Sequence, residues 1–98
     1  MTATTTEDQG RVKIFLRGAF IDSAGTVFWR ALKGAKGWNV VIDLTAVTKI
    51  DDHGLAMIEA AVEVWKLDLR EFTIVCPDGP VKQMCLSSRI AVHLSILS

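Results

Sequence analysis

The sequence predicts a small α/β domain with a mixed sheet of four to five strands and three or more helices packed on it. Strand-like and helix-like segments alternate along the chain, which is typical of sheets with parallel neighbours. The segment 40–44 is almost continuously apolar, which is typical of a central strand covered on both faces. Because 98 residues is the length of one ordinary domain, we expect residues 1–98 to form a single domain.

The first half of the chain contains a strand and an amphipathic helix. Val12, Ile14 and Leu16 alternate with Lys13, Phe15 and Arg17, which predicts a strand with one wetter face. The threonine-rich residues within 1–8 either add a weak hairpin strand or remain flexible. Asp22 or Ser23 is placed to cap a helix that ends near Gly34 and Gly37. The apolar stripe of this helix consists of Ala24, Val27, Phe28, Ala31, Leu32 and Ala35.

The second half repeats the alternation. After the central strand we expect a connection over 45–50 and a helix to about Leu67, with an apolar stripe at helical spacing. Residues 72–76 predict another buried strand, and Pro80 suits the first turn of a third helix. Alternating Val92, Leu94 and Ile96 predict a last strand. The stripe of the middle helix consists of Leu55, Ile58, Val62 and Trp65.

Composition excludes several classes of function. Half of the residues are apolar, and eleven Lys and Arg balance eleven Asp and Glu, so the chain lacks the basic footprint of a nucleic-acid binder. With two Cys and two His we expect no metal site, and we expect no cofactor. Because the first ten residues are polar, we expect no signal peptide there, and no apolar run is long enough to span a membrane. We therefore expect a cytoplasmic location without membrane insertion.

Charge is unevenly distributed although it cancels overall. Residues 11–37 contain six Lys and Arg against one Asp, whereas residues 38–72 contain seven Asp and Glu against three Lys and Arg. The simpler interpretation is a pair of solvated faces that keep the molecule soluble. The alternative is a surface with complementary poles for a partner.

An acidic turn, Asp51-Asp52-His53-Gly54, joins the central strand to the middle helix. The N-terminus of a helix carries free N–H groups and partial positive charge, so Asp52 is placed to cap this helix. Gly54 either permits another backbone to approach closely or relieves the tight turn from strand to helix. Asp51, Asp52 and His53 could form a catalytic acid/base cluster only if their side chains converged on one point beside a nucleophile. The side chains of consecutive residues at a helix start point in different directions. We therefore expect no catalytic residues.

The segment that runs from Val40 to Leu55 reads V-V-I-D-L-x-x-V-x-x-I-D-x-x-G-L. This pattern resembles the signature of the STAS domain, which is shared by sulfate transporters and bacterial anti-sigma factor antagonists. The resemblance implies a STAS-like fold and a non-catalytic protein–protein interaction domain that regulates transcription by partner switching. An alternative within the family is a STAS subunit of a lipid-transport or other ABC-type complex.

In antagonists, the residue after the turn's first Asp is a Ser or Thr. It is phosphorylated by the anti-sigma factor, a histidine-kinase-like Ser/Thr kinase. By this resemblance Asp51, Gly54 and Leu55 match the pattern, Asp52 occupies the phosphorylated position, and His53 replaces a second hydroxyl residue. A carboxylate cannot enter that phosphorylation cycle. Asp52 therefore mimics the phosphorylated state, acts only as a helix cap, or meets a changed partner.

The resemblance predicts a docking surface around the start of the middle helix. Its expected partner is an anti-sigma factor or another regulatory protein. Many STAS domains have a further helix after the last strand, so its absence here would expose apolar sheet surface, and homodimerisation is a further expectation. The predicted partner-binding residues are Asp22, Ser23, Asp51, Asp52, His53, Gly54 and Leu55.

Overall fold

The computed structural model describes residues 1–94, and its sheet has four strands in that part of the chain. They are β1 (Thr2–Asp8), β2 (Arg11–Phe20), β3 (Asn39–Ile50) and β4 (Phe72–Val75), in the spatial order β1-β2-β3-β4. β1 is antiparallel to β2, whereas β2, β3 and β4 are mutually parallel. The predicted mixed α/β sheet is confirmed, and the threonine-rich start of the chain forms its first strand.

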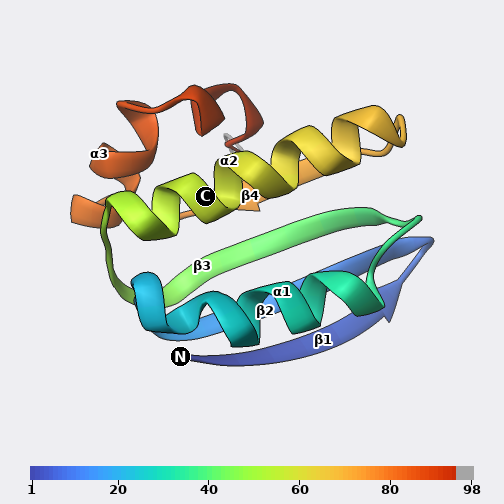
Figure 1. Ribbon diagram of the computed structural model, residues 1–98, viewed down its shortest axis with the longest axis horizontal. Coiled ribbons are helices and arrows are strands. Elements are labelled where there is room, and N and C mark those ends of the chain that lie inside the picture. Colours follow the sequence, from blue (N-terminus) through green and yellow to red (C-terminus); the bar gives the residue numbers. More distant parts are fainter. Residues whose placement is uncertain (95–98) are drawn as a thin grey trace.

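The helices connect the parallel strands. They are α1 (Gly25–Gly34), α2 (Asp52–Leu67) and α3 (Pro80–Leu86), with short 3₁₀ helices η1 (Asp22–Ala24) and η2 (Arg89–His93). α1 and α2 lie next to each other over one face of the sheet (Figure 1). A right-handed crossover between successive parallel strands places consecutive helices on the same face when the strands follow each other in spatial order.

The hydrophobic core lies between this face and the helices. Alternate residues of the three parallel strands are buried, and the apolar stripes of α1 and α2 close over them. The predicted stripes are confirmed in α2 and largely in α1, where Val27 and Ala31 are only half-buried. The buried residues include Ile14, Leu16, Phe28, Leu32, Ile42, Leu44, Ile58, Trp65, Phe72 and Ile74.

β3 is longer than predicted. The expected connection over 45–50 is wrong, because β2 continues to pair with β3 as far as Phe20 and Ile50. Between the pairs Phe15–Asp43 and Arg17–Ala46, two steps along β2 accompany three along β3, which is a β-bulge. Asp43 Oδ1 accepts a hydrogen bond of 2.8 Å from the Thr45 N–H, and its Oδ2 lies 3.7 Å from Lys13 Nζ. The buried carboxylate thus satisfies a backbone donor at the bulge.

The predicted last strand is wrong over Val92 and His93. Val92 and His93 lie in η2, and Leu94 makes a single parallel bridge to Ile74. A local turn replaces the strand because the Ser88 hydroxyl accepts a hydrogen bond of 3.3 Å from the Ile90 N–H, and Ile90 is buried. Ile96, the third residue of that prediction, lies outside the described residues.

We predict that Asp43→Ala lowers the free energy of unfolding by about 1–3 kcal/mol, because it leaves a backbone donor at the bulge without its acceptor. Asp43→Asn retains an acceptor and should cost less. Thr45→Ala retains the N–H of an exposed residue and should change stability by less than about 0.5 kcal/mol. Urea unfolding measures all three, and equal stability of Asp43→Ala and wild type would contradict the role assigned to this carboxylate.

Candidate functional site

Two connections meet at one end of the sheet, where the parallel strands β2 and β3 both finish (Figure 1). β2 leads into η1, and β3 leads into α2. The Asp51 N–H donates a hydrogen bond of 3.4 Å to the Phe20 carbonyl oxygen, directly after the last strand pair. The start of α2 and η1 are therefore held against each other by the strand register.

Gly54 lies where this contact is tightest. It is buried in the first turn of α2, and a Cβ atom at this position would overlap the Phe20 carbonyl oxygen. The same atom would lie 2.9 Å from Ile50 Cγ1. The sequence suggested two roles for Gly54. The structure shows the first of them, the close approach of another backbone. The missing side chain lets α2 begin directly on the end of β2.

Asp51, and not Asp52, caps α2. The backbone at Asp51 is extended (φ −117°, ψ −174°), and its Oδ1 accepts a hydrogen bond of 2.9 Å from the Gly54 N–H. The predicted capping role of Asp52 is therefore wrong, because the helix begins one residue earlier than a cap at Asp52 would require. Asp52 is the first helical residue and is exposed. Within residues 1–94 its carboxylate has no hydrogen-bond or ion-pair partner.

The other predicted site residues divide between surface and interior. His53 is exposed, and its Nδ1 lies 3.7 Å from Asp51 Oδ2. Leu55 is buried in the core, so a partner at the surface cannot contact most of its side chain. Asp22 and Ser23 are exposed in η1, but neither caps a helix: Ile21 precedes η1, and no side chain makes a capping hydrogen bond there.

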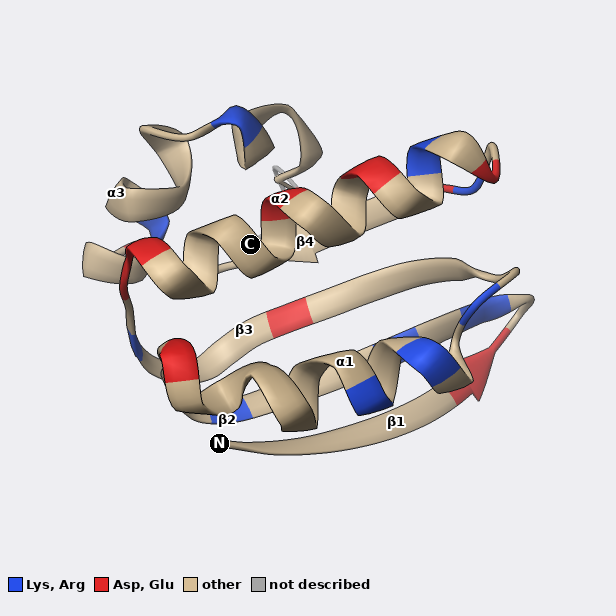
Figure 2. Cartoon of the chain, viewed as in Figure 1, with Lys and Arg blue, Asp and Glu red and all other residues tan. Residues whose placement is uncertain are grey.

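These residues define a surface that we call the acidic tip, formed by Asp22, Ser23, Asp51, Asp52 and His53. It contains three carboxylates on two adjoining elements, and Figure 2 shows the acidic positions at η1 and at the start of α2. Lys49 is the nearest cation along the chain, three residues before Asp52. An exposed cluster of one sign favours a partner of the opposite sign.

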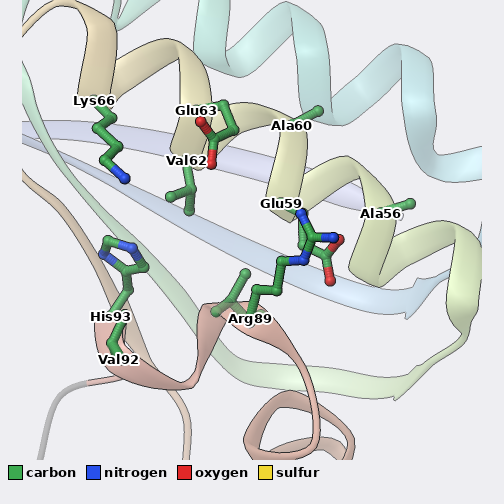
Figure 3. Close-up of a pocket in the computed structure, with 10 residues that line it drawn as sticks. Ala56, Glu59, Ala60, Val62, Glu63, Lys66, Arg89, Val92 and His93 are labelled. Carbon is green, nitrogen blue, oxygen red and sulfur yellow. The ribbon is translucent and has the colours of Figure 1, made fainter.

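A second group of charged residues was not predicted. Glu59 and Glu63 of α2 line a groove together with Lys66 and, from η2, Arg89 and His93 (Figure 3). This groove is not predicted from the sequence, because the alternation over residues 92–96 indicates a strand there. Its mixture of acids and bases selects no particular class of ligand.

The remaining reactive groups are internal. Cys76 and Cys85 are both free and buried. Burial raises the pKa of the Cys85 thiol to about 11, so it stays protonated at neutral pH and is a poor nucleophile. In the part of the chain that the structure describes, no three His, Cys, Asp or Glu side chains are grouped to hold a metal ion. None of the described helices has the length and apolar character needed to cross a membrane.

The chain belongs to the STAS domain family, whose sequence model matches residues 5–94. No curated protein sequence matches it significantly. The structure is similar to a putative anti-sigma factor antagonist from Thermotoga maritima, with a TM-score of 0.82 and 15% identity over 95% of this chain and 83% of that one. It is also similar to the Bacillus anti-sigma factor antagonist SpoIIAA in its unphosphorylated form, with a TM-score of 0.79 and 11% identity over 96% of this chain and 86% of that one.

The same fold occurs within larger proteins. The murine anion transporter Slc26a9 matches with a TM-score of 0.75 and 11% identity, over 91% of this chain and 16% of the transporter. Mglu matches with a TM-score of 0.69 and 25% identity, over 76% of this chain and 19% of the other. The chain thus spans less than a fifth of either larger protein, and these likenesses establish the fold.

We predict that Gly54→Ala lowers the free energy of unfolding by more than about 2 kcal/mol, because the added methyl group displaces the start of α2 from the end of β2. The matched control is Gly34→Ala, at the last residue of α1, where a Cβ meets nothing within 4 Å. This control should be neutral or stabilising by up to about 1 kcal/mol. Thermal unfolding followed by circular dichroism measures both, and equal stabilities would contradict the tight contact.

Proposed function

We propose that this STAS domain acts by docking the acidic tip on a regulatory protein, as a switch of the anti-sigma-factor-antagonist type. One observation carries the proposal. The Asp52 carboxylate is exposed and unpartnered in the described structure, while its neighbour Asp51 makes the capping hydrogen bond. Capping of α2 therefore does not account for Asp52, and its charge remains available to a partner.

The charge of Asp52 is the chemical basis of the proposed switch. SpoIIAA, which has a similar fold, exists in an unphosphorylated and a phosphorylated form. A phosphoserine carries about −1.5 to −2 charges at neutral pH, and an aspartate carries one. Both groups place negative charge at a helix N-terminus, where the helix dipole stabilises it. Asp52 would therefore hold the domain in a state that resembles the phosphorylated one.

The partner should carry Lys or Arg opposite the acidic tip. A conventional anti-sigma factor, a histidine-kinase-like Ser/Thr kinase that binds the unphosphorylated state, lacks this feature and should not bind the wild-type domain. The partner is therefore a changed kinase of this type or another regulatory protein, in the bacterial cytoplasm. The rigid seating of α2 on β2 supports this role, because a preorganised surface loses little entropy on binding. The domain itself catalyses no reaction in this proposal, and the partner supplies any phosphoryl transfer.

We predict that Asp52→Ser creates a site that an anti-sigma kinase phosphorylates or binds. A kinase that discriminates against the phosphorylated state should neither modify nor bind the wild-type domain. Intact mass after incubation with ATP and the candidate kinase reports modification, and analytical gel filtration reports complex formation. Asp52→Asn is the matched control, because it removes the charge without adding a hydroxyl group.

The expected pattern is phosphate on Asp52→Ser alone, and complexes with Asp52→Ser and Asp52→Asn that are stronger than those of the wild type. Identical masses and identical elution for all three proteins, across a panel of such kinases, would contradict a switching role for position 52.

A further inference from the structure

Another surface lies between α1 and α2. It is formed by the later residues of both helices, whereas the acidic tip lies at the start of α2. This surface is a groove of about 210 Å³ that opens to solvent between the two helices. We call it the interhelical groove. Its lining residues are Trp29, Leu32, Lys33 and Lys36 from α1 and the turn that follows it, and Val64 and Trp65 from α2.

The apolar part of the interhelical groove is partly exposed and fixed in position. Trp29 and Val64 are each 39% exposed. The Trp29 ring packs edge-on against the buried Phe28 ring, with 5.2 Å between their centroids. Trp65 is buried, and its indole N–H donates a hydrogen bond of 2.8 Å to the Trp38 carbonyl oxygen. The groove is therefore preformed, which lowers the entropic cost of filling it.

On the α1 side of the interhelical groove, every charged residue is positive. Residues 25–36 contain Arg30, Lys33 and Lys36 and no Asp or Glu. Within residues 1–94 neither of the groove's lysines forms an ion pair. Figure 2 shows the basic positions along α1. An apolar slot with unneutralised cations on its rim is complementary to a ligand that combines a bulky apolar group with carboxylates.

We propose that the interhelical groove binds an acidic amphipathic helix of a partner protein. Such a helix would insert one or two large apolar side chains between Trp29 and Val64. Acidic residues one turn before or after them would lie opposite Lys33 and Lys36. The spacing of anchors at i and i+4 suits a groove that runs between two helices. The acidic tip requires a cationic partner, so this surface is independent of the proposed switch and leaves both sites free to be occupied together.

A lipid surface is the other ligand that combines apolar and negative groups. The shape of the site argues against it. Leu32 and Trp65 line the groove but are 2% and 4% exposed, so only a narrow inserted group can contact them. A protruding side chain on a helix has that form, whereas a flat bilayer would contact only the exposed rim.

The test uses a panel of fluorescein-labelled peptides of about 18 residues, each with Leu or Phe at i and i+4 on a helical face. The acidic series carries Glu beside the anchors, and the matched basic series carries Lys at the same positions. Fluorescence anisotropy measures affinity, and the tryptophan indole N–H signals in a nitrogen–proton spectrum locate the site. We expect the acidic series to bind and to shift the Trp29 indole signal, and the basic series not to bind.

Charge reversal tests the role of the lysines. Lys33→Glu/Lys36→Glu should weaken the acidic peptide about tenfold, as expected for two exposed charge pairs. Arg11→Glu/Arg17→Glu is the matched control, because it makes the same change of charge at two exposed positions of β2, away from α1. It should change affinity less than threefold, roughly the contribution of long-range charge alone. Trp29→Ala should also weaken binding about tenfold or more.

Three results would overturn the proposal. One is failure of every acidic peptide to bind at about 1 mM, the weak end of specific recognition. Another is equal loss of affinity in the groove variant and the β2 control. The third is tighter binding to vesicles of phosphatidylglycerol and phosphatidylcholine than to the acidic peptides, which would assign the surface to a membrane instead.

Discussion

The structure depends on the contact between the first turn of α2 and the last residue of β2. Gly54 has no side chain to separate these elements, and the Asp51 N–H bonds to the carbonyl group of Phe20. The contact exists because β2 and β3 stay in register as far as Phe20 and Ile50. A bulge absorbs the difference in length between the strands, and the Asp43 carboxylate satisfies a backbone donor there. Core packing, strand register and helix start thus converge on one end of the sheet.

Two adjacent carboxylates at this end have different roles. Asp51 is half-exposed and accepts the hydrogen bond that begins α2, so its role is structural. Asp52 follows it in the helix and faces solvent, without a described partner. A helix start of this kind presents a charge on a rigid support, which is the arrangement a docking surface requires. This helix start lies within residues 5–94, the part of the chain that the STAS family model matches.

The strand and helix pattern was predictable because burial on one face leaves a clear periodicity in β2, α1 and α2. The strand over 45–50 was not, because a bulge breaks the alternation that the prediction relies on. η2 was missed because Val92 and Leu94 alternate as a strand would, whereas Ser88 and the buried Ile90 impose a turn. The sequence does not identify the capping residue, because two consecutive Asp residues suit the role equally and only backbone geometry distinguishes them. The basic side of the interhelical groove belongs to the cationic excess visible over residues 11–37, whereas its apolar slot depends on the packing of two helices and was not predictable.

The most direct measurement maps which surface meets a partner in the cell. A photo-crosslinking amino acid replaces His53 in the acidic tip or, as a control, Thr4, which is exposed on β1. Mass spectrometry after illumination of cells that normally contain the protein then identifies the attached chains. We expect a protein adduct from position 53 that position 4 does not give. An adduct from position 4 with none from position 53 would contradict docking through the acidic tip.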